Sequence, residues 1–163
     1  MKKDPTKTSL LDGRRISKDS KIAWGVGTLD EANAFIGLAK VFARDRDVKE
    51  TLQEIQKMIF KLGAEIASNE FKIGEEEYKW LIDLVKKFEN SVNKPRRFVI
   101  LEKDEATALL SVARTVVRRA ERVAVSLHRE GIVSELFVEW LNKLNYLLYL
   151  MILKEGKEFT EVS

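Results

Sequence analysis

The sequence predicts an all-α fold, an up-and-down bundle of five helices, and three observations lead to this prediction. Hydrophobic residues make up 45% of the 163 residues and charged residues 34%, which is typical of a compact globular protein. Only 8 glycines and 2 prolines interrupt the chain. Apolar residues recur at steps of three and four through most of it, as helices with one buried face require.

Chain length favours one domain over residues 1–163, with an N-terminal arm over residues 1–20 and a helical bundle over residues 22–155. The arm is polar, basic and rich in Thr and Ser, and Asp12-Gly13 is a turn signal within it. We therefore expect a loop-like arm. Three of its side chains could contact a ligand or simply be solvated: Thr8, Ser9 and Lys18.

Five segments with helical periodicity follow in order. The predicted helices cover residues 22–44, 47–67, 75–91, 104–129 and 134–154. Asp104 and Ser134 are good N-caps for the last two helices, and Gly131 and Gly156 are placed to end them. Because the connections are short, we expect neighbouring helices to be antiparallel.

The clearest interruption of the helical pattern lies between the third and fourth helices. Pro95 disfavours a helix at and before its own position. The apolar run Phe98–Leu101 follows and could form a strand. Since no partner strand is evident, an extended and packed connector fits this run better.

Several classes of site and location are excluded by composition. The chain has no cysteine, so disulfides, thiol catalysis and Cys-ligated metals are excluded, and His128 is its single histidine. No run of 18 apolar residues suggests a membrane span, and the N-terminus lacks the apolar core of a secretory signal. We therefore expect a cytoplasmic protein that does not associate with a membrane. The net charge of +3 selects no partner by itself.

The fourth predicted helix carries a dense row of arginines within the run Ala113–Arg122. Arg114, Arg118 and Glu121 follow at steps of four and three and share one face, Arg122 extends the row, and Arg119 lies to one side. Arginines facing a polyphosphate would supply bidentate, charge-assisted hydrogen bonds. The same row could instead be a solvated basic face balanced by neighbouring acids, and periodicity leaves both readings open.

Two acids on other helices also have two interpretations. Glu139 and Asn142 lie on the flank of the Leu-rich fifth helix, where they could hold a Mg²⁺-nucleotide or satisfy a neighbouring arginine. Asp30 lies on the first helix and could pair with an arginine of the fourth, within the chain or across a subunit boundary. The glycines at positions 25 and 27 are not a phosphate-binding P-loop, because no Gly-Lys-Ser/Thr ending follows.

A series of short runs, taken in order, resembles the PduO-type ATP:cob(I)alamin adenosyltransferases over nearly the whole chain. The N-terminal matches are Thr8-Ser-Leu-Leu, Gly13-Arg-Arg-Ile-Ser-Lys-Asp19 and Gly27-Thr-Leu-Asp-Glu-Ala-Asn33. The later ones are Leu52–Gln56, Leu62–Ile66, Phe98–Ile100, Val112–Arg122 and Leu141–Leu144. The most specific is Val112-Ala-Arg-Thr-Val-Val-Arg-Arg-Ala-Glu-Arg122.

This resemblance implies a ferritin-like five-helix bundle that forms a homotrimer with active sites between subunits. It implies transfer of the 5′-deoxyadenosyl group of ATP to cob(I)alamin, with triphosphate released and Mg²⁺ bound; K⁺ as a second ion is left open. In such a reaction Co(I) attacks the ribose C5′ directly, so the protein supplies positioning and stabilises the leaving-group charge. A cobalamin reductase or an acceptor enzyme would be a partner, and nucleic acid would not.

The resemblance also assigns residues by position. The ATP-binding set is Thr8, Ser9, Lys18, Arg118, Arg119, Glu121, Arg122 and Asn142, with Glu139 close to the metal. Arg114 and Arg118 line the active site, and Asp30 pairs with Arg114 of a neighbouring subunit. Phe98 matches the aromatic residue that closes on the corrin ring and helps to displace the lower axial ligand of cobalt.

The N-terminal loop departs from the family pattern. Family members begin with a Thr-Gly-Asp-x-Gly-x-Thr loop that wraps the triphosphate, whereas this chain has Lys2-Lys-Asp-Pro-Thr-Lys-Thr8, without either glycine. Pro5 stiffens the turn and removes an N–H donor. The alternative function is therefore a non-catalytic trimer that binds a nucleotide or corrinoid; a basic nucleic-acid-binding module is the third hypothesis.

Overall fold

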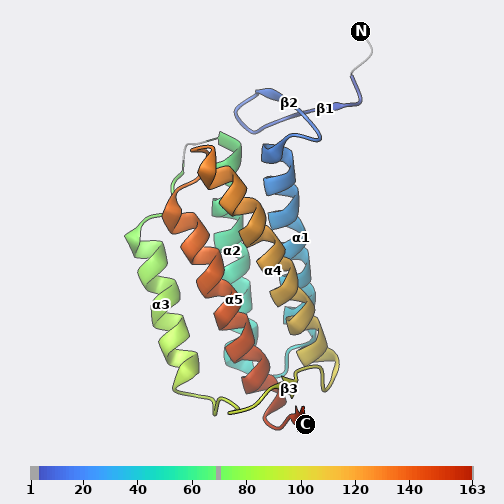
Figure 1. Ribbon diagram of the computed structural model, residues 1–163, viewed down its shortest axis with the longest axis vertical. Helices are drawn as coiled ribbons and strands as arrows, with labels where there is room; N and C mark the ends of the chain where they lie inside the picture. The colour runs from blue at the N-terminus through green and yellow to red at the C-terminus, as the bar shows by residue number, and fades with distance from the viewer. Residues whose placement is uncertain (1–3, 69–70, 163) are drawn as a thin grey trace.

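The computed structural model describes residues 4–68 and 71–162, and it confirms the five predicted helices (Figure 1). They are α1 (Lys21–Phe42), α2 (Arg46–Ser68), α3 (Glu75–Glu89), α4 (Glu105–Arg129) and α5 (Glu135–Gly156). Helix α1 packs against α2 and α4, and α5 packs against α4 and α3. The up-and-down bundle is therefore confirmed, with α1 and α3 at its opposite edges in the view of Figure 1.

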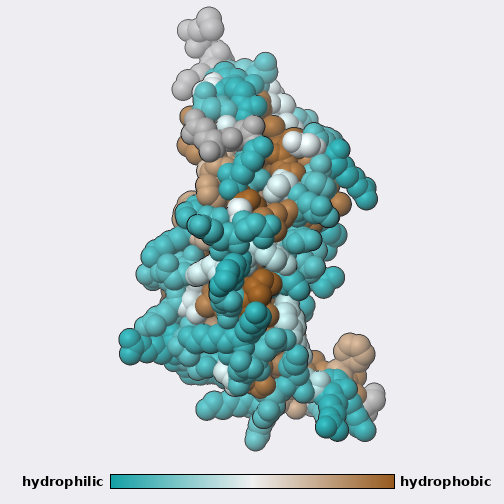
Figure 2. All heavy atoms as spheres, turned by 90° about the vertical axis from the view of Figure 1, so that its left-hand side faces the viewer, coloured by the Kyte–Doolittle hydropathy of each residue, from teal (hydrophilic) through white to brown (hydrophobic). Residues whose placement is uncertain are grey.

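Helix α5 forms much of the core. Trp140 and Phe137 are fully buried, as are most of the leucines along this helix. It is long and apolar enough to cross a membrane by length and composition, but 61% of its most apolar window is buried inside the bundle. It is therefore a core helix rather than an indication of a membrane span. The surface on the α3 side is mainly hydrophilic, with only narrow apolar strips (Figure 2).

The predicted helix ends are confirmed at three positions and corrected at one. The side chains of Asp104 and Ser134 accept hydrogen bonds from Thr107 N and Phe137 N, as N-caps do. Gly131, just beyond α4, has a φ of 73°. At the end of α5, however, Gly156 is still helical, and the chain turns at Lys157, which has a positive φ of 62°.

The cap at Asp104 predicts a pH dependence of stability. Burial raises the pKa of this carboxyl, but hydrogen bonds from Thr107 and Arg44 outweigh it, so the pKa lies below its ordinary value of 3.8. The ionised cap therefore stabilises the fold above the unfolded-state pKa, and this contribution disappears as the pH falls through the folded-state pKa. We expect the wild-type protein to have a free energy of unfolding about 1 kcal/mol higher than that of the Asp104→Asn variant. This difference should be constant above about pH 5 and shrink below about pH 4. Urea unfolding at several pH values measures it, and an equal difference at pH 3 and pH 7 would contradict it.

The N-terminal arm is a β-hairpin, so the prediction of a loop-like arm was wrong. Strands β1 (Lys7–Ser9) and β2 (Arg15–Ser17) pair antiparallel, with Thr8 opposite Ile16. The predicted turn signal is correct, since Gly13 has a φ of 84° between them. Strands of three residues are too short to show an alternating pattern in the sequence. Residues 1–3 of the predicted arm lie outside the described residues.

The run Phe98–Leu101 also differs from its prediction. Val99–Ile100 forms strand β3, which pairs antiparallel with β4 (Thr160–Glu161) near the other end of the chain. The partner strand is two residues long and distant in sequence, so no local pattern predicts it. The run is not packed throughout either, because the Phe98 side chain is 88% exposed.

Candidate active site

The arginine row of α4 begins with a partly buried residue, Arg114. Its carbonyl oxygen accepts a hydrogen bond of 2.9 Å from Asn145 Nδ2, which places this part of α4 against α5. Its Nε is buried and has no hydrogen-bond partner among the described residues. A buried guanidinium N–H without an acceptor is costly, so an acceptor from outside this chain is expected at Arg114.

Arg118 and Glu121 lie on the same face of α4 as Arg114. They lie one and two turns after it, with Arg118 exposed and Glu121 half-buried. Asn142 is exposed on α5, one turn before Asn145. The structure therefore brings Arg114, Arg118, Glu121 and Asn142 to one side of the bundle, along the flank of the α4–α5 contact.

Arg119 and Arg122 lie on the other flank of α4. Arg119 forms an ion pair with Glu31 of α1. Together with Lys21, Trp24 and Arg122, it lines a shallow pocket of about 320 Å³ between α1 and α4. Both partners of the ion pair are about half exposed, so the pair contributes less than ~1 kcal/mol to stability. The row is thus divided between two faces.

Glu139 lies on a different side of α5 from that row. Burial raises the pKa of Tyr78 on α3, and the charge of Glu139 raises it further, so this carboxylate is near α3. No group of three or more His, Cys, Asp or Glu side chains in residues 4–68 and 71–162 is placed to hold a metal ion. Mg²⁺ commonly takes one or two carboxylates and completes its shell with phosphate oxygens and water, and a single glutamate fits that pattern.

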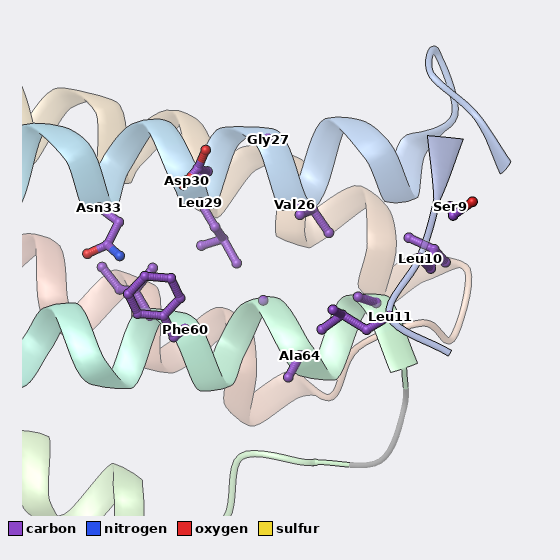
Figure 3. Close-up of a pocket in the computed structure, with 13 residues that line it drawn as sticks. Ser9, Leu10, Leu11, Val26, Gly27, Leu29, Asp30, Asn33, Phe60 and Ala64 are labelled. Atoms are coloured by element: carbon purple, nitrogen blue, oxygen red, sulfur yellow. The ribbon is translucent and has the colours of Figure 1, made fainter. Parts of the chain in front are cut away.

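A second set of predicted residues surrounds a groove between α1, α2 and the hairpin. It encloses about 420 Å³ and has mainly apolar walls (Figure 3). Ser9 and Asp30 lie on its rim, together with Leu10, Leu11, Val26, Asn33 and Phe60. Leu11 and Phe60 are 83% and 71% exposed, although both are large and apolar. An exposed apolar surface of this kind indicates contact with another molecule.

Sequence reasoning missed two residues of this groove, Asn33 and Phe60. Asn33 is buried, and its Oδ1 has no hydrogen-bond partner among the residues described. Phe60 stands next to Ile59 but outside the apolar stripe of α2. A large aromatic residue off the buried stripe of an amphipathic helix was the available signal.

The remaining hairpin residues are near the groove but make few side-chain contacts. Thr8 is half-buried in β1, and Lys18 is exposed just after β2, where its backbone N–H donates to Thr6 O at 2.9 Å. Asp4 accepts hydrogen bonds from the backbone N–H and the hydroxyl of Thr6, at 2.9 and 2.7 Å. The short segment before β1 therefore uses its polar groups internally.

The predicted site is divided within one chain. Asp30 lines the α1–α2 groove, whereas the backbone carbonyl of Arg114 contacts Asn145 of α5, and no ion pair joins Asp30 and Arg114 among the described residues. Phe98 adjoins β3 at the end of the bundle opposite the hairpin (Figure 1). One chain presents the hairpin and Asp30 on one side, and Arg114 and Arg118 on another.

Comparison with known proteins identifies the family. A sequence model described as cobalamin adenosyltransferase matches residues 1–155. The chain belongs to this family. The resemblance predicted from the ordered motifs is confirmed, and with it the assignment to a family of enzymes.

Curated members of the family are similar over most of the chain. A corrinoid adenosyltransferase of Citrobacter freundii is 33% identical over 151 residues, which are 88% of this chain and 86% of the relative. Another from Bacillus subtilis (strain 168) is 31% identical over 150 residues, which are 87% of this chain and 77% of the relative.

The fold also matches a solved member. A variant of the PduO-type ATP:corrinoid adenosyltransferase from Lactobacillus reuteri, complexed with cobalamin and ATP, superposes with a TM-score of 0.87. The match covers 96% of this chain and 94% of that chain, at 22% identity. This likeness confirms the five-helix architecture.

Proposed function

We propose that this chain transfers the 5′-deoxyadenosyl group of ATP to cob(I)alamin, forming adenosylcobalamin and releasing triphosphate. Co(I) supplies the electron pair for the new cobalt–carbon bond, and the C5′–oxygen bond of ATP breaks as the triphosphate leaves. The observation that carries this proposal is the match to the cobalamin adenosyltransferase family over residues 1–155, which includes the complete arginine row.

The α4 arginines would bind the triphosphate. Arg118, Arg119 and Arg122 are exposed, so an anion can reach all three guanidinium groups, although at Arg119 it would have to displace Glu31. Charge that develops on the departing triphosphate is stabilised by fixed cationic donors. Glu121 and Asn142, with the hairpin residues Thr8, Ser9 and Lys18, would complete the ATP contacts. Glu139 would be the single carboxylate near Mg²⁺, and K⁺ remains an optional second ion.

A homotrimer would join the two divided halves of the site. Asp30 of one subunit would meet Arg114 of the next, so the groove that carries Ser9 and Asn33 would face the arginine row. Two unpaired buried atoms support this arrangement: Arg114 Nε needs an acceptor, and Asn33 Oδ1 needs a donor. The exposed Leu11 and Phe60 would be covered by the same contact.

A charge exchange tests the proposed contact between subunits. We expect Asp30→Arg and Arg114→Asp each to shift the protein from trimer toward monomer at micromolar concentration, because each places like charges at the contact. The double variant should recover the trimer. Light scattering after size exclusion measures the molar mass, and Asp83→Arg on exposed α3 is the matched control. A double variant no more trimeric than either single variant would refute the pairing.

Phe98 would contact the corrin ring. Its side chain is large, apolar and 88% exposed, so it is free to cover an apolar ligand surface. By closing on the ring it would displace the lower axial ligand of cobalt. A cobalamin reductase or an acceptor enzyme would exchange the corrinoid with this protein, and we place the protein in the cytoplasm.

The decisive experiment is an anaerobic assay with ATP, Mg²⁺ and chemically reduced cobalamin. The expected result is the adenosylcobalamin absorption spectrum together with stoichiometric triphosphate. Absence of product at every temperature at which the fold survives would overturn the proposal.

A non-catalytic binding trimer is the alternative, and one observation favours it. The segment that would wrap the triphosphate contains Pro5 and is closed on itself by the Asp4–Thr6 hydrogen bonds. ATP or cobalamin binding in calorimetry without turnover would identify this alternative. Restoring a glycine-containing loop over residues 2–8 should then recover activity.

A further inference from the structure

The backbone of Phe98 is held although its side chain is free. Phe98 O accepts a hydrogen bond of 2.8 Å from Val162 N. The pairs Val99–Glu161 and Ile100–Thr160 continue the same antiparallel register, in which Val162 stands opposite Phe98. The side chain of Phe98 is nevertheless 88% exposed. The C-terminal segment therefore holds the backbone of Phe98 in place but leaves its side chain uncovered.

The C-terminal segment is itself anchored to the core helix α5. The ring of Phe159 lies so close over Gly156 that a Cβ at that glycine would clash with Phe159 Cζ. Lys103 Nζ donates to Gly156 O at 3.2 Å, which joins the same point to the segment after β3. Lys157 then turns the chain with a φ of 62°, a conformation that non-glycine residues rarely adopt. The direction in which the C-terminal segment over residues 157–162, called the tail below, leaves α5 is therefore fixed.

Side-chain contacts add little to this attachment. Arg97 and Glu161 form an ion pair of 3.5 Å, but both side chains are more than half exposed, so the pair is weak. Among the described residues, β4 is the strand partner of β3. Leu101 packs against the core three residues further on, and at Phe98 itself the backbone hydrogen bond to the C-terminal segment is the restraint.

We infer that the C-terminal strand β4 is the positioning element for Phe98, an inference that rests on the proposed function. Rigid α5 holds the tail through Phe159 and Gly156, the tail holds β3, and β3 presents Phe98. The tail acts through Phe98 and need not touch the substrate itself. Weakening β4 should therefore lower the rate of the corrinoid step and leave ATP binding unchanged.

A matched pair of variants at position 162 tests the inference. Val162→Pro removes the N–H that donates to Phe98 O, whereas Val162→Ala keeps it. In the free protein, we expect amide hydrogen exchange of a peptide over residues 97–101 to be about five- to tenfold faster in the proline variant than in the alanine variant, as loss of one hydrogen bond implies. Exchange of a peptide from the middle of α4 should be equal in both.

Turnover then shows whether the attachment acts through Phe98. We expect kcat to fall about five- to tenfold in Val162→Pro at unchanged ATP affinity, and to stay near the wild-type value in Val162→Ala. The double variant Phe98→Ala with Val162→Pro should be no slower than Phe98→Ala alone, because both changes remove the same function. Electron paramagnetic resonance of bound cob(II)alamin should show more of the lower axial ligand retained in Val162→Pro than in Val162→Ala.

Three results would overturn the inference: equal exchange of residues 97–101 in the two variants, equal turnover, or additive losses in the double variant. Failure of the proposed function gives a different pattern. In that case the wild-type protein makes no adenosylcobalamin, while the exchange comparison still decides whether β4 orders the Phe98 segment.

Discussion

Arg118→Lys is expected to lower kcat/KM for ATP about 100-fold, the size of effect seen when one preorganised donor to developing charge is removed. Lysine keeps the positive charge but not the planar fork that binds two phosphate oxygens at once. Arg118 is exposed on the face of α4 shared with Arg114, and no internal hydrogen bond or ion pair of its side chain is present among the described residues. The variant should therefore keep the fold and molar mass of the wild-type protein.

Initial rates at varied ATP, with reduced cobalamin in excess, measure this effect. Arg129→Lys is the matched control, because Arg129 is also exposed and lies in the last turn of α4, outside the proposed site. It should turn over at nearly the wild-type rate. Arg118→Lys with near-normal turnover would show that the triphosphate is bound elsewhere.

Glu155→Ala is expected to lower the free energy of unfolding by about 2–4 kcal/mol, the largest stability effect we predict for a single side chain. One oxygen of this buried carboxylate accepts hydrogen bonds from Arg44 N and Asp45 N, at 3.0 and 2.8 Å. These amides lie between α1 and α2, so Glu155 ties the α1–α2 connection to the end of α5. Alanine would leave both part-buried amides without this acceptor and remove the buried side chain that joins them to α5.

Urea unfolding at fixed protein concentration measures the loss, and two variants serve as controls. Glu155→Gln should cost less than about 1 kcal/mol, because both hydrogen bonds reach the same oxygen and the amide oxygen of glutamine can accept them. Glu158→Ala removes an exposed acid nearby and should be neutral. If the glutamine variant were as unstable as the alanine variant, charge rather than hydrogen bonding would be the cause.

The helices were predictable because each depends on local information. Periodic apolar residues define α2 and α4, and Asp104 and Ser134 mark helix starts through hydrogen bonds to amides three residues away. The hairpin and β3 were missed because their strands are two or three residues long. The pairing of β3 with β4 joins the middle of the sequence to its C-terminal part, so no local pattern carries information about it.

The sequence proposes the members of the candidate site, but it could not predict how they are arranged. The motif around Arg118 and Arg122 indicated an anion site, yet periodicity could not show that Arg119 pairs with Glu31 of α1 or that the backbone of Arg114 contacts Asn145 of α5. Buried acids that satisfy backbone amides were also missed. Glu65, which accepts from Ile73 N at 2.7 Å, looks in the sequence like any other helical glutamate. Such roles depend on which loop a side chain meets in space.

The ion pair between Arg119 and Glu31 makes anion capture at this arginine an exchange of partners. An incoming oxyanion must take the guanidinium from a carboxylate already in place, so it gains only the difference between the two acceptors. A group with the charge of a carboxylate gains almost nothing in this exchange. A doubly charged terminal phosphate gains more, because the attraction grows with the charge of the acceptor. Anion binding at Arg119, as proposed here, would therefore favour acceptors of higher charge, because Glu31 on α1 already pairs with this arginine.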